Sequence, residues 1–260
     1  MKFRKAELGD WGARASLTIA ALMVMAASAN AQQLPHSLRD ALLGHKGPAE
    51  TRRVAAPPVA RYVSEAGGGF IFDQAAPRPL MKFDNSAEVW VLSPQAASRG
   101  DVIYRNDLGE PVLRVTKLGG MILFTDDAPM GAAAALSGRA TSIQPPSILS
   151  FSVFIQRVRI ATARASRAAQ RDIEFSTVED VRPETSVLAA DSATVVAEAF
   201  ERMARKGDRS LISRIARVLL AEGHKPAASL KDGSLTITYS PDQGVAGRPS
   251  SKRIIKVLNR

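Results

Sequence analysis

A series of short β-prone segments constrains the fold more than any other feature of this 260-residue chain. Between residues 61 and 125 these segments are rich in Val, Ile, Leu and aromatic residues, and Gly, Pro, Asn and Asp separate them. This arrangement is typical of antiparallel sheets, because strands joined by tight turns pair with their neighbours in the sequence. The segments are Phe70–Phe72, Leu80–Phe83, Glu88–Leu92, Val102–Tyr104, Val112–Thr116 and Met121–Phe124.

One turn within this region is especially clear. The sequence Asn106-Asp107-Leu108-Gly109 lies between two of the segments, and Asn, Asp and Gly all tolerate the positive φ angles of hairpin turns. Gly67-Gly68-Gly69 precedes the first segment, and we interpret it as a glycine turn that lets the arm bend into the sheet rather than as a cradle for an anion. We therefore expect a small antiparallel β meander over residues 61–125.

The chain after residue 146 shows the periodicity of helices. The alanine run and prolines of residues 131–146 indicate a loop or hinge before them. Apolar residues at the 3.6-residue period then predict helices over 147–171 and 187–206, and a third from Asp208, an N-cap residue, to Gly223. Leu235–Tyr239 alternates as a strand after the Asp232-Gly233 turn, and we expect Ile254–Leu258 to pair with it.

These patterns predict an α+β fold: a small antiparallel β meander, then about three helices, then a C-terminal β-hairpin. We expect one domain over residues 61–258, since 65 residues of short strands bury too little surface to be stable alone. Within it, 61–125 would be β-rich, 147–222 helical, and 234–258 would form the C-terminal strands.

The first 31 residues have the pattern of a signal peptide. A net-basic segment, an apolar stretch over Leu17–Ala27 and the small residues of Ala29-Asn30-Ala31 follow one another in the required order. The apolar stretch is about half of the roughly 20 residues that span a bilayer, so cleavage near Ala31 is favoured over retention as an anchor. We expect a periplasmic or secreted protein, with a Pro/Ala-rich arm or linker over residues 32–60.

Composition restricts the possible functions. Hydrophobic residues make up 45% of the chain and charged residues 23%, which is typical of a globular protein. Cys is absent, so disulfides, thiolate metal sites and a Cys nucleophile are excluded. The 5% aromatic content argues against an aromatic-lined carbohydrate cleft. The formal net charge of +10 favours anionic partners.

The sequence lacks recognisable catalytic motifs. His36 and His45 lie in the arm and His224 follows the third predicted helix, and no serine-hydrolase or zinc motif accompanies them. We therefore predict no catalytic residue, no metal site and no cofactor. Four carboxylates of the β region could serve an enzyme of unrecognised type, but sequence spacing alone does not pair them: Glu88, Asp101, Asp107 and Glu110.

The sharpest candidate site is a row of arginines on the first predicted helix. They fall within an arc of about 80°, roughly opposite the apolar face, and no acidic residue interrupts the row before Asp172. Such a row could bind phosphates or lipid headgroups, although a solvated face is the favoured interpretation. The anion-binding candidates are Arg157, Arg164, Arg167 and Arg171.

Three blocks of sequence carry a resemblance to a known family. They are Glu88–Pro94, Arg99–Thr125 and Gly247–Ile254. In these blocks the chain resembles a bacterial family of exported proteins known only as a domain of unknown function, and the resemblance covers residues 61–255. It implies export and a single α+β unit, and it supplies no activity and no catalytic residue.

Three functions remain open. The favoured one is a non-enzymatic structural or accessory protein of the cell envelope, whose partner would be another envelope protein. The second is a binder of an anionic envelope polymer or membrane surface through the basic helix. The third is an enzyme that uses the carboxylates of the β region. We expect no specific nucleic-acid partner and no transmembrane helix in the mature chain.

Overall fold

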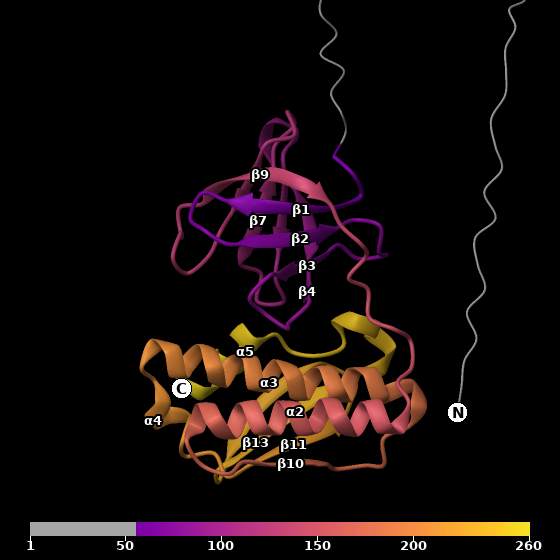
Figure 1. Cartoon of the computed structure of the whole chain (residues 1–260), viewed down its shortest axis with the longest axis vertical. Helices are drawn as coiled ribbons and strands as arrows, with labels where there is room; N and C mark the ends of the chain where they lie inside the picture. Colours follow the sequence, from indigo (N-terminus) through magenta and orange to yellow (C-terminus); the bar gives the residue numbers. More distant parts are fainter. Residues whose placement is uncertain (1–55) are drawn as a thin grey trace, which may run out of the picture. The chain divides into compact units, whose positions relative to one another are not determined.

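Two β-sheets organise residues 56–260, which are the residues that the computed structural model describes (Figure 1). The predicted signal peptide and most of the predicted arm, with His36 and His45, lie outside the described residues. The first strand begins at Val59, so the last residues assigned to the arm belong to the sheet. No helix among the described residues has the length and apolar character needed to cross a membrane.

The first sheet is antiparallel and has nine strands in the order β4-β3-β2-β1-β9-β8-β7-β6-β5. A short 3-10 helix, Ser98–Gly100, precedes β6. The strands are β1 Val59–Ser64, β2 Gly69–Asp73, β3 Leu80–Phe83, β4 Trp90–Val91, β5 Ser93–Ala96, β6 Val102–Arg105, β7 Pro111–Val115, β8 Met121–Leu123 and β9 Ala132–Arg139.

This sheet curves until its two edges meet. Its edge strands β4 and β5 are separated by Leu92 alone, so one bent segment pairs with β3 through its first half and with β6 through its second. On the opposite side β1 pairs with β9, the last strand of the region. We call this nine-stranded structure the rolled sheet. Rolling satisfies backbone groups that an open edge would expose to solvent.

The prediction of a small meander is therefore wrong, as is the prediction of a loop over residues 131–146. Half of that stretch is β9, which forms ladders with both β1 and β8. Alanine has little intrinsic β propensity, so nothing in the local sequence indicated a strand. The hydrogen bonds offered by two neighbouring strands decide its conformation.

Aromatic side chains fill the interior of the rolled sheet. Tyr62 stacks on Phe70 with ring centroids 5.5 Å apart, and Phe72 meets Tyr104 edge to face at 5.0 Å. Such pairs stabilise by roughly 0.5–1.5 kcal/mol beyond the effect of burial alone. Buried Leu and Met residues, such as Leu113 and Met81, complete this core.

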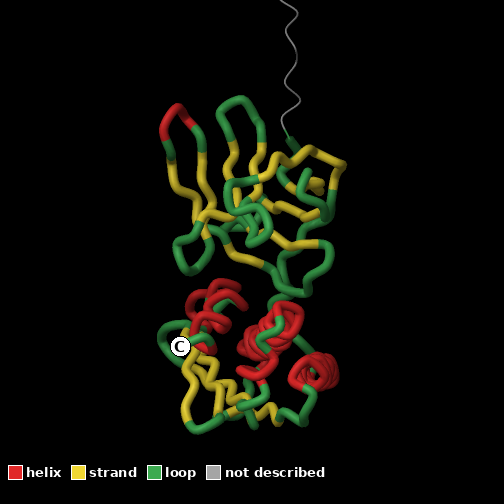
Figure 2. Tube along the Cα trace, turned by 90° about the vertical axis from the view of Figure 1, so that its left-hand side faces the viewer, coloured by secondary structure: helices red, strands yellow, loops and turns green. Residues whose placement is uncertain are grey.

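The second sheet has the order β10-β11-β13-β12, and helices α2, α3 and α5 lie along one face of it (Figure 2). Strands β10, β11 and β13 are parallel, and β12 pairs antiparallel with β13. We call this part the α/β layer. Its elements are α2 Phe151–Ala169, β10 Glu174–Thr177, α3 Ser186–Lys206, α4 Arg209–Ile212, β11 Arg217–Glu222, β12 Ala227–Lys231, β13 Ser234–Tyr239 and α5 Ser251–Leu258, with 3-10 helices Pro183–Thr185 and Pro241–Ala246.

The first two predicted helices are confirmed as α2 and α3. Ser150 caps α2 by accepting a hydrogen bond from the amide of Val153 at 3.4 Å. Helix α3 ends at Gly207, whose φ of +92° continues the chain out of the helix, and two backbone bonds close this end. The predicted strand over 235–239 and its Asp232-Gly233 turn are also confirmed, since both turn residues have positive φ.

Two other predictions in this part are wrong. The third predicted helix is a short helix, α4, followed by strand β11. Its run of apolar residues fits either period, and β11 is a strand because parallel neighbours pair with it on both sides.

The predicted C-terminal strand over 254–258 is helix α5. Ser250 accepts a hydrogen bond from the amide of Arg253 at 3.1 Å, which starts the helix, and Ile254 and Leu258 are buried on one helical face. The hairpin at this end of the chain instead joins β12 to β13.

Candidate functional site

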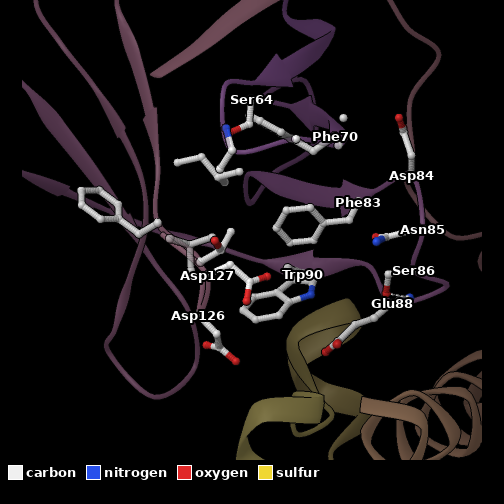
Figure 3. Close-up of a pocket in the computed structure, with 18 of the residues that line it drawn as sticks. Ser64, Phe70, Phe83, Asp84, Asn85, Ser86, Glu88, Trp90, Asp126 and Asp127 are labelled. Atoms are coloured by element: carbon white, nitrogen blue, oxygen red, sulfur yellow. Dashed lines mark hydrogen bonds between the residues drawn. The ribbon is translucent and has the colours of Figure 1, made fainter. Parts of the chain in front are cut away.

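A cavity of about 710 Å³ lies at one end of the rolled sheet, where strand ends meet helices α3 and α5. We call it the mouth cavity. Its lining comes from β1, β2, β3, β4, β7 and β8, from the turns between them, and from the two helices. Figure 3 shows Phe70, Phe83 and Trp90 on one side of this space, with Asp84, Glu88, Asp126 and Asp127 around it. The site therefore combines an apolar wall with a charged rim.

Two aromatic rings form the centre of the apolar wall. Phe83 and Trp90 meet edge to face, with centroids 6.3 Å apart and an interplanar angle of 86°. Phe70 lies behind Phe83, at a centroid distance of 6.2 Å. These residues point inward because side chains alternate along each strand, so every second residue of β2, β3 and β4 faces the same interior. Leu123 and Val112 extend the wall from the neighbouring strands.

The glycine run forms part of the rim. Gly67 and Gly68 have φ angles of +92° and +78° and make the hairpin turn between β1 and β2. Gly69 is buried, and a Cβ atom there would lie 2.8 Å from the guanidinium of Arg61 and closer still to Asp84. The glycines therefore form a turn, as predicted, but it joins β1 to β2 rather than the arm to the sheet. The third glycine leaves room for an ion pair between Arg61 and Asp84.

Three cations surround one carboxylate at the rim. The carboxylate of Asp126, in the loop after β8, lies 2.6 Å from Lys206, 3.2 Å from Lys252 and 3.5 Å from Arg202. Burial alone would raise the pKa of Asp126, but the hydrogen bond from Lys206 and the charge of Lys252 outweigh burial, and the pKa falls to about 2. Asp126 is therefore ionised at neutral pH.

A second charged group lies buried beneath the rim. Arg248 donates to Asp191 and, at 2.7 Å, to the backbone carbonyl of Val89, and its Nη1 atom lies 3.6 Å from Oε1 of Glu88. Burial raises the pKa of Glu88, and the charge of Arg248 and hydrogen bonds from Ser251 oppose that rise only in part. One buried guanidinium is thus shared by two carboxylates, Glu88 and Asp191.

The two charged groups are connected. Ser251, the first residue of α5, donates its backbone amide to Glu88 at 3.0 Å and also its hydroxyl. The guanidinium of Arg202 donates to the same hydroxyl oxygen at 2.8 Å. The start of α5 is thereby held to α3 and to the segment before β4, which fixes the helical side of the mouth cavity.

The predicted arginine row is divided by the tertiary structure. Arg164 donates to Glu201 at 2.9 and 2.6 Å and to Glu198 at 3.1 Å, so α3 supplies the acidic partners that α2 itself lacks. Arg171 donates to the backbone carbonyl of Ser213 at 2.8 Å. Arg157 and Arg167 are exposed, and neither forms an ion pair within residues 56–260.

Three of the four carboxylates of the β region, Glu88, Asp107 and Glu110, contact the start of α5, each through different residues, and Asp101 lies elsewhere. Asp101 accepts from Arg114 at 2.8 Å, Asp107 from Arg253 at 2.7 Å, and Glu110 from Lys252 at 2.9 Å. Glu88 alone lines the mouth cavity. His224 follows strand β11 rather than a helix, and residues 56–260 contain no cluster of three or more potential metal ligands.

Sequence reasoning missed the wall and the cations of this site. A low overall aromatic content concealed the concentration of the aromatic residues in one region. The spacing of Glu198 and Arg202 predicts an ion pair within the helix, whereas Glu198 pairs with Arg164 in the structure. Spacing carried one usable signal, since Arg202 and Lys206 are four residues apart and share a face of α3. Lys252 comes from an element that was predicted to be a strand.

The blocks that carry the family resemblance meet beside this site. Glu88 contacts Arg248 and Ser251, and Lys252 contacts Glu110, so all three blocks are in contact. A family model described as "Domain of unknown function (DUF4908)" matches residues 37–258, and the chain belongs to that family. No curated protein and no solved structure matches the chain.

Proposed function

We propose that this chain is an exported, non-enzymatic accessory protein of the cell envelope, and that it binds a small amphipathic molecule in the mouth cavity. Export rests on the leader pattern of residues 1–31. One observation carries the binding role: the cavity of about 710 Å³ has an apolar wall and a charged rim. Small-molecule sites in proteins measure roughly 300–1,000 Å³ and have this mixed lining.

The lining suits a ligand with two different ends. An apolar chain against Phe83 and Trp90 would be stabilised by about 25 cal/mol for each Å² removed from water. A polar end would remain at the rim, among charged side chains that are partly hydrated. Antiparallel sheets that roll up around a small ligand use the same division between an apolar interior and a polar opening.

Two carboxylates that line the mouth cavity, Asp126 and Glu88, favour binding over hydrolysis. A glycosidase needs one carboxylic acid that is protonated near neutral pH beside a second, ionised one. Asp126 has a pKa of about 2, so it cannot donate a proton near neutrality. Glu88, whose pKa is raised, points toward Ser251 and Arg248 and is 1% exposed.

Fluorescence of Trp90 tests this proposal. The chain has two tryptophans, Trp11 and Trp90, so the W11F variant leaves only the one in the cavity wall. We expect the uncharged probe decanol to change the emission of Trp90 in a saturable manner. V63F should weaken decanol binding about tenfold by filling the cavity, and V153F should not, because Val153 lies on α2 outside the cavity.

Two results would contradict the proposal. One is the absence of saturable binding of decanol to the folded W11F chain. The other is equal weakening by V63F and V153F, because an exposed valine is replaced in both variants and only the first lines the cavity.

A second function has a specific observation in its favour. Val153 and Ile160 are 38% and 52% exposed on α2, and they lie near Arg157 and Arg167 on the helical wheel. Exposed apolar residues among arginines are typical of a helix face that rests on an anionic membrane surface. Binding to vesicles of phosphatidylglycerol that weakens steeply with salt would support this role, and equal binding to uncharged vesicles would contradict it.

A further inference from the structure

The cations at the rim of the mouth cavity are arranged to receive an anion. Arg202 and Lys206 extend from one face of α3, and Lys252 extends from the first turn of α5. All three approach the carboxylate of Asp126, at 3.5, 2.6 and 3.2 Å. Their positions are set by two helices, and Ser251 links these helices through its contacts with Arg202 and Glu88.

Positive charge exceeds negative charge at this part of the rim. Two carboxylates, Asp126 and Glu110, pair with the three cations, and Glu110 contacts Lys252 alone, at 2.9 Å. Arg205 lines the same cavity without an ion-pair partner in the described part of the chain. Among the other carboxylates that line the cavity, Asp84 pairs with Arg61, Glu198 with Arg164 and Glu88 with Arg248. Asp127 forms no ion pair within residues 56–260. This excess of positive charge favours a ligand whose polar end is negatively charged.

The neutralising carboxylate belongs to a loop, whereas the cations belong to helices. Asp126 lies between β8 and β9 in a turn closed by backbone bonds between Thr125 and Ala128, of 3.2 and 3.3 Å. Its side chain is 35% exposed. Another anion can therefore replace the carboxylate of Asp126 among the cations without any movement of α3 or α5.

From this arrangement we propose that the amphipathic molecule carries an anionic headgroup, a carboxylate or a phosphate monoester, which binds Arg202, Lys206 and Lys252 in competition with Asp126. The inference rests on the proposed function, because the apolar chain of the same molecule would lie against Phe83 and Trp90. Charge-assisted hydrogen bonds from lysine and arginine are among the strongest contacts available to either headgroup.

The inference is tested by comparing ligands that differ only in the headgroup. The full chain carrying W11F is titrated with decanoate, decyl phosphate and decanol, and binding is followed through Trp90. We expect at least one of the two anions to bind about tenfold more tightly than decanol. The tighter of the two identifies the headgroup, and either anion supports the inference.

Variants of the rim sharpen the test. D126N removes the competing carboxylate, and we expect it to tighten binding of the preferred anion about tenfold and to leave decanol within about twofold. D127N is the matched control, since it changes the net charge equally but Asp127 forms no ion pair with these cations in the described chain. K206M should weaken binding of the anion and not of decanol. Decanol binding also verifies that each variant is folded.

The outcomes separate the two proposals. If decanol binds and neither anion binds more tightly, or if D126N and D127N have the same effect, the headgroup inference is wrong and the binding function stands. If none of the three probes binds the folded chain, both proposals are wrong.

Discussion

The rolled sheet and the α/β layer bury their apolar residues with different side chains. Large aromatic rings fill the rolled sheet, among them Tyr62, Phe70 and Trp90. The layer relies instead on small residues, because many of the buried positions of α2 and α3 are alanines, such as Ala165 and Ala193. Small side chains allow helices to approach closely, whereas a rolled sheet has a wide interior that only large side chains fill.

This difference explains where a ligand site can form. In the alanine-rich layer, small buried side chains let α2 and α3 pack closely on each other. At the end of the rolled sheet, the aromatic rings come from strands that diverge from the helices, and the mouth cavity lies between them. The tightly packed layer holds the cations in place, and the rolled sheet supplies the apolar wall.

The largest expected effect comes from breaking the connection between the two regions. R248M removes the cation shared by buried Glu88 and partly buried Asp191, and we expect the free energy of unfolding to fall by about 3–5 kcal/mol. Urea denaturation measures this loss. R253M is the control, because Arg253 pairs with Asp107 at the surface, and its loss should be about 0–1 kcal/mol. Equal losses of stability in R248M and R253M would show that Arg248 does not join the rolled sheet to the α/β layer.

The next prediction compares added volume in the two regions. A193L inserts three carbon atoms where no space exists, and we expect a loss of about 1–3 kcal/mol in the free energy of unfolding. V63F adds bulk beside the mouth cavity, where Val63 is 41% exposed, and should cost less than about 0.5 kcal/mol. Thermal denaturation compares the two variants. A greater loss in V63F would overturn the contrast in packing.

A smaller effect concerns acid stability at the rim. The pKa of Asp126 is about 2 in the folded chain, below its ordinary value of 3.8. A lowered pKa contributes stability above the ordinary value, and this contribution is lost as the pH falls toward 2. After a discount for partial exposure, we expect a loss of about 1 kcal/mol between pH 4 and pH 2. Denaturation at both pH values measures it, and D126N should remove this part of the dependence.

The smallest expected effect concerns the exposed face of α2. R157Q and R167Q should each change the free energy of unfolding by less than about 0.5 kcal/mol, since both side chains are exposed. R164Q should cost more, because Glu198 would remain nearly buried without its partner. If the face binds anionic vesicles, R157Q and R167Q should also reduce the salt dependence of that binding. Equal stability of all three variants would contradict the division of the arginine row.

Several elements could be predicted because their signals are local. Strands β2, β3, β6, β7 and β8 carry β-prone residues between turn residues, and α2 and α3 show the helical period over several turns. Family membership could likewise be anticipated from three blocks of sequence, although activity could not. For each of these helices and strands, the residues that decide the conformation lie within one or two turns or strands of one another.

Other features depend on residues that are far apart in the sequence. Alanine-rich β9 is a strand because β1 and β8 pair with it, and β11 is a strand rather than a helix because β10 and β13 flank it. Arg164 pairs with two glutamates of α3. The charge pattern of α2 alone therefore predicted more unpaired arginines on this helix than the structure has. Local propensity is weak compared with the hydrogen bonds and burial that a neighbouring element provides.

The sequence by itself determined the period of α2, α3 and several strands of the rolled sheet, the positions of most turns and the absence of thiol chemistry, because these follow from the residue types in a short window. Only the tertiary structure decided that the sheet closes on itself, that Phe83 and Trp90 share a wall, and that three cations meet Asp126. The physical reason is that a cavity and its charge arise from side chains brought together across long sequence separations, and such contacts leave no periodic pattern in the sequence.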